Sequence, residues 1–97
     1  MNFEEGRNFW AKVLGIRGPQ WMIIVALEEL DRGQGVPVTA VATMLHVNQT
    51  FVLTQSRVLE RKGFVRRTAG AAGSLFLTDK AHRHLADPAY PWSRSVQ

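Results

Sequence analysis

The chain has 97 residues, of which 45% are hydrophobic and 21% charged, and a formal net charge of +4; this composition is ordinary for one globular domain. Cysteine is absent, which excludes disulfides, thiol catalysis and cysteine-ligated zinc. No apolar run approaches the roughly 20 residues that would cross a bilayer, and the first residues lack the layout of a secretory signal, so we expect a cytoplasmic protein.

The first third of the chain predicts two helices and a short strand. Residues 3–14 have an apolar face at helical spacing. Pro19 suits the first turn of a second helix, and residues 21–30 are apolar around most of the circumference, as in a central core helix. The glycine-containing residues 31–35 end that helix. Residues 36–38 then predict an edge strand, where a proline is tolerated.

Two short amphipathic segments follow, separated by a turn of two residues. Thr39 can cap the first segment. His46-Val47 form the turn, and Asn48 can cap a second helix that lasts until Lys62, where Gly63 supplies a left-handed residue. Helices joined so closely must cross steeply, which predicts a helix-turn-helix.

The second of these helices has two different faces when its residues are placed about 100° apart. Val52, Ser56 and Leu59 lie on one side, with Gln55 at its margin, and this side is expected to pack. The opposite side carries an uninterrupted polar row, here called the polar row: Thr50, Thr54, Arg57 and Arg61. Hydroxyl and guanidinium groups in such a row suit a helix in the DNA major groove. The alternative is an ordinary solvated surface.

The rest of the chain predicts a hairpin and a last helix. Residues 64–68 and 74–77 read as strands joined by a flexible turn at 69–73. Thr78 can cap a helix over residues 79–86. The predicted fold is therefore mainly α with a small β-hairpin (α+β): a winged helix-turn-helix.

Proline at position 88 stops the last helix. We accordingly expect a winged helix-turn-helix domain over residues 1–87 and a tail over residues 88–97.

Charge is unevenly distributed along the chain. Residues 1–31 contain three basic and five acidic residues, whereas residues 32–78 contain six basic residues and one acidic residue. The positive charge therefore lies over the helix and the hairpin that we expect to bind DNA.

Three runs of residues in this order resemble the MarR family of transcription regulators: residues 18–21 (GPQW), residues 59–67 (LERKGFVRR) and residues 77–81 (LTDKA). The resemblance covers nearly the whole chain. It implies a homodimer that binds double-stranded DNA without a cofactor, with the recognition helix (residues 48–62) in the major groove and the wing (residues 64–77) on the backbone or minor groove.

The residues expected to bind DNA lie on these two elements and at the start of the preceding helix. Base recognition is expected mainly from residues 49, 50, 54 and 57, and phosphate contact from residues 61, 62, 66 and 67. The full predicted set is Thr39, Asn48, Gln49, Thr50, Thr54, Arg57, Arg61, Lys62, Arg66 and Arg67.

The chain departs from the family in two places. Family wings often carry an Asp-x-Arg motif, but residues 69–73 have no charge, and the long C-terminal dimer helices of the family have no counterpart after residue 87. If a dimer forms, its aromatic candidates are Phe9, Trp10, Tyr90 and Trp92; for Phe9 and Trp10 ordinary core packing is the alternative.

Two further hypotheses concern partners. With an uncharged wing, the domain could be a winged-helix protein-interaction module in which DNA binding is weak or lost. In the resembled family, small aromatic or acidic effectors bind between the DNA-binding lobe and the dimer helices and release DNA. Trp10, Trp21 and Met22 could line such a pocket, with core packing as the alternative.

No catalytic constellation is present, so we do not expect an enzyme. His82 and His84 are two residues apart on a helix and point apart, unlike an i, i+4 metal pair. His46 lies in the predicted turn. We therefore predict no metal site.

Overall fold

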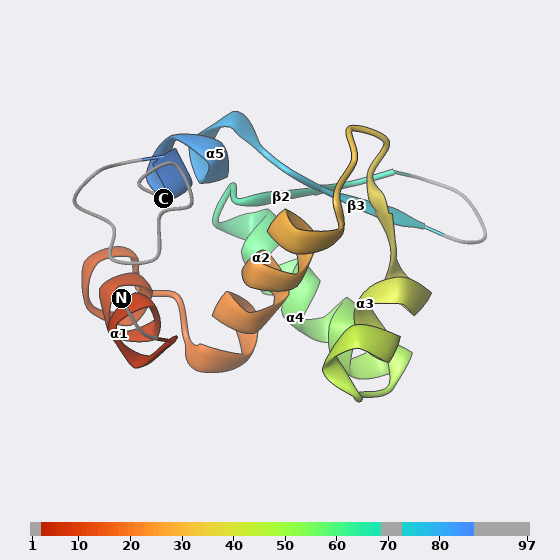
Figure 1. Ribbon diagram of the computed structural model, residues 1–97, viewed down its shortest axis with the longest axis horizontal. Helices are drawn as coiled ribbons and strands as arrows, with labels where there is room; N and C mark the ends of the chain where they lie inside the picture. Colours follow the sequence, from red (N-terminus) through yellow and green to blue (C-terminus); the bar gives the residue numbers. More distant parts are fainter. Residues whose placement is uncertain (1–2, 69–72, 87–97) are drawn as a thin grey trace.

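The computed structural model describes residues 3–68 and 73–86. Its elements follow one another in the predicted order (Figure 1): α1 (Phe3–Leu14), α2 (Gly18–Leu30), β1 (Val36–Pro37), α3 (Val38–Leu45), α4 (Gln49–Arg61), β2 (Val65–Arg67), β3 (Ser74–Leu77) and α5 (Asp79–Ala86). The fold class predicted from the sequence, a winged helix-turn-helix, is confirmed.

The three strands form one antiparallel sheet in the order β1-β3-β2. Val36 lies opposite Leu75, and Val65 lies opposite Leu77. The edge strand predicted at residues 36–38 is therefore present, one residue shorter than expected, because Val38 already begins α3.

Helix α2 is the centre of the fold and contacts α1, α3, α4 and β3. Its side chains are apolar on nearly all sides, and Trp21, Ile23, Ile24 and Leu27 are completely buried. Each such side chain contributes about 1.5–3 kcal/mol through its removal from water. Helices α1 and α5 lie toward one end of the molecule and α3 toward the other (Figure 1).

The predicted cap of α3 is wrong. The N-cap residue is Pro37, in an extended conformation, and no side chain caps this helix. Pro37 takes that conformation because β1 pairs with β3, and the chain then enters the helix directly at Val38. Thr39 consequently lies inside the first turn, with its side chain exposed.

The other predicted caps are confirmed. The Asn48 side chain accepts a hydrogen bond from the Phe51 N–H (2.7 Å), which satisfies an otherwise unpaired donor at the start of α4. Gly63 follows α4 with φ of 85°. Thr78 Oγ1 accepts from the Ala81 N–H (3.3 Å) and donates to the Gly63 carbonyl (2.6 Å), and so joins the start of α5 to the residues that follow α4.

Two predicted segments lie outside the described residues: most of the turn at residues 69–73 and the tail at 88–97. Within the described residues, no helix is both long enough and apolar enough to span a membrane.

Gly35 is placed where a side chain would be costly. Its φ is 83°, and a Cβ added there would lie 2.5 Å from the Phe76 ring. Gly33 has a similar φ of 93° but open space around it. We expect Gly35→Ala to lower the free energy of unfolding by about 1–2 kcal/mol more than Gly33→Ala, because only the first overpacks a ring. Urea denaturation of both variants measures this difference, and equal losses would contradict the close approach to Phe76.

Candidate nucleic-acid interface

The packing face of α4 is the one predicted. Val52, Ser56 and Leu59 are buried, and α4 contacts α2, α3 and β2. Gln55, predicted at the margin, is half-buried. Because these side chains recur every three or four residues, their burial fixes which side of the helix faces away from the protein.

The polar row lies on that outward side. Thr50, Thr54, Arg57 and Arg61 are all exposed, so the predicted geometry of the row is confirmed. At 1.5 Å per residue the row extends over about 16 Å, which suits a major groove about 12 Å wide and open along its length. DNA contact by these four residues stays a prediction.

Three arginine side chains, two on α4 and one on β2, have no polar partner among the described residues. The side chains of Arg57, Arg61 and Arg67 make no hydrogen bond or ion pair with any other described residue. Their guanidinium groups are exposed. Five donors on each planar group therefore remain available for a base edge or a phosphate.

An open surface groove lies at the helix-turn-helix turn. It is lined by Thr39, Ala42, Thr43, His46, Val47, Asn48 and Gln49. His46 makes the turn in a left-handed conformation (φ 57°), and the Val47 N–H donates to the Ala42 carbonyl (3.1 Å). The structure thus brings together three residues predicted to bind DNA, at positions 39, 48 and 49. Because Asn48 Oδ1 already caps α4, its amide nitrogen is the group left for a partner.

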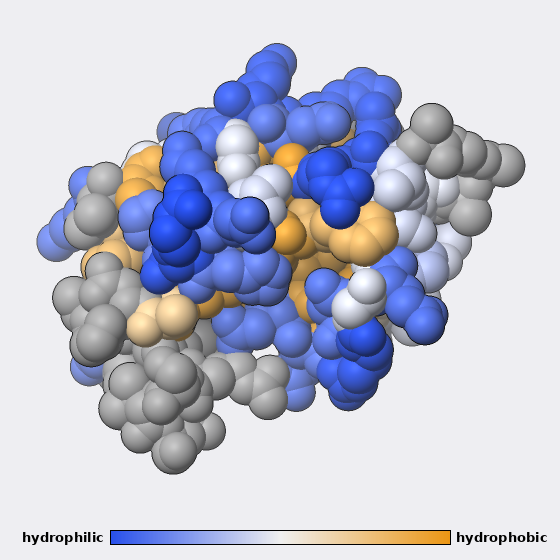
Figure 2. Space-filling model, turned by 90° about the horizontal axis from the view of Figure 1, so that it is seen from above, coloured by the Kyte–Doolittle hydropathy of each residue, from blue (hydrophilic) through white to orange (hydrophobic). Residues whose placement is uncertain are grey.

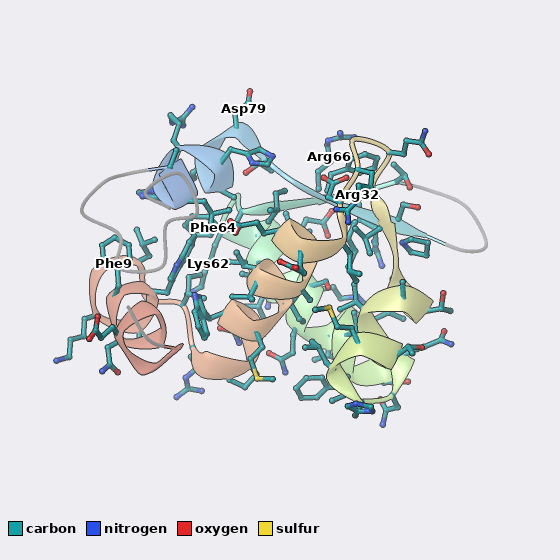
Figure 3. The ribbon with its side chains drawn as sticks, viewed as in Figure 1. Phe9, Arg32, Lys62, Phe64, Arg66 and Asp79 are labelled. Atoms are coloured by element: carbon teal, nitrogen blue, oxygen red, sulfur yellow. The ribbon has the colours of Figure 1, made fainter. Side chains whose placement is uncertain are left out.

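The two wing arginines occupy different faces of the sheet, as strand alternation predicts. Arg66 lies opposite Phe76 and holds its guanidinium carbon 4.4 Å from the ring centroid (Figure 3). Arg67 lies opposite Leu75, on the other face. Arg66 is therefore partly immobilised by a cation–π contact, whereas Arg67 is the freer of the two.

Lys62 has a different environment from the other predicted DNA-binding residues. Its Nζ donates to the Gly15 carbonyl (2.7 Å), between α1 and α2, and its own carbonyl accepts from Lys80 Nζ (2.9 Å) (Figure 3). The Lys62 side chain thus makes a hydrogen bond within the protein. The sequence could not indicate this contact, because residues 15 and 62 are 47 positions apart.

Of the four residues predicted to form a dimer interface, two lie among the described residues. Trp10 has no exposed surface and packs edge-on against Phe64 (5.4 Å between centroids) and His84 (6.1 Å). This position favours the core alternative for Trp10. Phe9 is half-buried. Tyr90 and Trp92 lie outside the described residues.

The three residues expected to line an effector pocket differ in their exposure. Trp10 and Trp21 are completely buried, whereas Met22 is 38% exposed. The two tryptophans therefore pack in the hydrophobic core, as in the alternative to a pocket. Among the described residues, no group of three or more His, Cys, Asp or Glu side chains is placed to hold a metal ion.

The face of the molecule above the sheet carries both hydrophilic and apolar side chains (Figure 2). Seen from above, it is mostly hydrophilic, and apolar side chains show only in parts between hydrophilic ones (Figure 2). Polar cover over a small apolar core is typical of a surface in water.

Ser56 is buried on the packing face of α4, and its hydroxyl has no hydrogen-bond partner among the described residues. A buried polar group without a partner costs about 1–3 kcal/mol. We expect Ser56→Ala to raise the free energy of unfolding by about 1 kcal/mol. Thr54→Ala, on the exposed side of the same helix, is the control for helix propensity. A loss of stability in Ser56→Ala, measured by urea denaturation, would contradict the unpaired hydroxyl.

Comparisons with known proteins give the fold. No protein-family model matches the sequence, and no curated protein sequence matches it. Solved structures do match. The transcriptional regulator BldR from Sulfolobus solfataricus superposes with a TM-score of 0.64 at 21% identity, over 82% of this chain and 58% of that one.

Two further structures agree. A MarR-family regulator from Rhodococcus sp. RHA1 has a TM-score of 0.69 at 20% identity, and the regulator Tm0710 from Thermotoga maritima has 0.66 at 24%. Each match covers 82% of this chain and 56% of the other. The chain thus spans somewhat more than half the length of these regulators, and it has the winged helix-turn-helix fold of the MarR-family transcription regulators.

Proposed function

We propose that the protein is a MarR-like transcription regulator that binds double-stranded DNA sequence-specifically, with α4 in the major groove. One observation carries this proposal: the polar row on α4 is exposed along its whole length, and its arginines are unpaired within the described residues. The fold, shared with known transcription regulators, supports it. The domain acts by binding, without a catalytic step or a cofactor.

The roles of the side chains follow from their positions on α4 and the wing. Gln49, Thr50, Thr54 and Arg57 occupy the first two and a half turns of the helix and would read base edges. Arg61, near the helix end, and Arg67, on the wing, would contact phosphates on either side of the groove. Arg66 would add to the positive field.

The regulator would bind as a homodimer to two half-sites about one helical turn of DNA apart, because a two-fold symmetric protein needs a matching site. Phe9 is half-buried on α1 and offers apolar surface for such a contact. Tyr90 and Trp92 are the other aromatic candidates. The cytoplasmic location expected from the sequence stays a prediction.

The proposal is tested by a gel shift with mixed genomic duplex fragments and excess nonspecific competitor. A subset of fragments is expected to be retarded at competitor concentrations that release the rest. Equal release of every fragment would refute sequence-specific binding and favour the protein-interaction alternative.

Arg67 is expected to contribute a phosphate contact and little sequence preference. Arg67→Gln should reduce the slope of log K against log salt by about 0.9, because one fewer counterion is released from the DNA. Affinity should fall by the same factor for every sequence. Lys12→Gln is the matched control, since it removes one exposed positive charge from α1. If both variants keep the wild-type slope, Arg67 does not contact the backbone.

A further inference from the structure

The connection between α1 and α2, residues 15–17, is held in one conformation by its own contacts. Gly15 is left-handed (φ 69°), and the Ile16 N–H donates to the Trp10 carbonyl (2.9 Å) while the Ile16 side chain is completely buried. The Arg17 N–H donates to Gln20 Oε1 (2.9 Å). This connection is therefore a fixed part of the domain.

Two hydrogen bonds join the α1–α2 connection and the first turn of α2 to the region of α4. Gln20 Nε2 donates to Gln55 Oε1 (2.8 Å), and Lys62 Nζ donates to the Gly15 carbonyl (2.7 Å). Gln55 lies in α4 and Lys62 is its C-cap residue. They are seven positions apart, so they lie on the same side of the helix at points separated by about 10 Å along its axis. One contact would leave a helix free to pivot about it, whereas two contacts separated along the axis oppose both pivoting and rotation.

The direction of the Gln20–Gln55 bond is set by the protein itself. Because Gln20 Oε1 accepts from the Arg17 backbone, its amide nitrogen must face α4, and Gln55 must present its oxygen. Gln20 is only 6% exposed. Any shift of α4 that breaks this bond leaves a buried donor unpaired, which costs more than the bond itself contributes.

Apolar packing alone would hold α4 less specifically. Val52 and Leu59 supply the attraction, but the hydrophobic effect has no direction. The two polar contacts supply the direction, and they lie on the flank of α4 away from the polar row. They therefore leave the row exposed while they fix the angle at which it meets a groove.

We propose that Gln20, Gln55 and Lys62 are positioning residues: through one hydrogen bond with the first turn of α2 and one with the α1–α2 connection, they hold α4 in the orientation that discriminates between DNA sequences. This inference rests on the proposed function. It reassigns Lys62 from a phosphate contact to a surface contact within the protein, between the end of α4 and the Gly15 carbonyl. Base recognition depends on the placement of side chains to within about 0.5 Å. A small rotation of α4 therefore lowers the preference for one DNA sequence over another more than it lowers the electrostatic attraction to the DNA backbone.

The experiment uses the full chain with Gln20→Met, Gln55→Met and Lys62→Met. Each variant keeps the apolar stem and removes the polar group. The readout is the discrimination ratio, which is the affinity for the preferred duplex divided by that for a random duplex. We expect each variant to lose about 3- to 30-fold in this ratio and about 4–8 °C in Tm. The double variant Gln20→Met/Gln55→Met should lose no more than the worse single variant, because both remove the same bond.

Matched controls separate positioning from stability. Gln34→Met and Lys12→Met change the same residue types at exposed sites outside the two contacts. Val25→Ala removes half-buried apolar surface from α2 and lowers Tm without touching either hydrogen bond. All three should keep the wild-type discrimination ratio. Lys62→Met should also keep the wild-type salt slope, whereas a phosphate contact would cost about 0.9.

The outcomes separate this inference from the proposed function. If the wild type discriminates and Gln20→Met, Gln55→Met and Lys62→Met keep its ratio, the positioning inference is wrong and the proposed function stands. If the discrimination ratio falls as much in Val25→Ala as in the three Met variants, loss of stability explains the effect and the inference is again wrong. A wild type that binds all duplexes equally removes the proposed function and this inference with it.

Discussion

Replacement of Leu59 by alanine is expected to lower the free energy of unfolding by about 2–5 kcal/mol. Leu59 is completely buried on the packing face of α4, in the same cluster as Trp21 of α2 and Val65 of β2. Removing its side chain leaves a cavity that the surrounding core side chains fill only in part. A domain of this size is typically stable by only about 5–15 kcal/mol, so a substantial part of the stability would be lost.

Urea denaturation followed by circular dichroism measures this loss. Glu60→Ala is the matched control, because Glu60 is the next residue on the same helix and its side chain is exposed. Its stability should stay within about 0.5 kcal/mol of the wild type. A Leu59→Ala variant as stable as Glu60→Ala would mean that α4 is not seated on the core through this face.

Replacement of Arg57 by alanine is expected to relax the sequence preference by about 1–3 kcal/mol at one or two base pairs. Arg57 is exposed in the middle of the polar row and unpaired among the described residues. A guanidinium there can make two parallel hydrogen bonds to one guanine, which no other base pair accepts in the same way. Alanine removes both bonds, so the preferred duplex should lose affinity while altered duplexes lose little.

Competition binding with duplexes changed one base pair at a time measures this effect. Arg67→Gln is the comparison, because it removes a guanidinium from the wing and should weaken all duplexes by the same factor. If Arg57→Ala also weakens every duplex equally, Arg57 is a phosphate contact and base recognition lies elsewhere.

The local features of the helix-turn-helix could be predicted from the sequence because they depend on neighbouring residues. Spacing of apolar residues identified the packing face of α4, and this in turn placed the polar row outside. Asn48 and Gly63 mark the two ends of the helix through their own backbone and side-chain chemistry. Such signals act over three or four residues.

Features set by distant residues could not be predicted in the same way. Thr39 resembles a helix cap, but pairing of β1 with β3 places Pro37 in that position. Trp10 lies on an amphipathic helix, and only the approach of Phe64 and His84 shows that its ring faces the protein's own core. The contact made by Gln20 could not be predicted, since its partner Gln55 is 35 residues away.

The central claim is that the exposed row on α4 reads DNA sequence, and selection of bound duplexes from a random pool tests it most directly. The wild-type chain should enrich a motif, and the Thr54→Ala/Arg57→Ala variant should lose the preference at the positions that α4 contacts. Recovery of unenriched random sequence by the wild type, or of the same motif by both proteins, would contradict the claim.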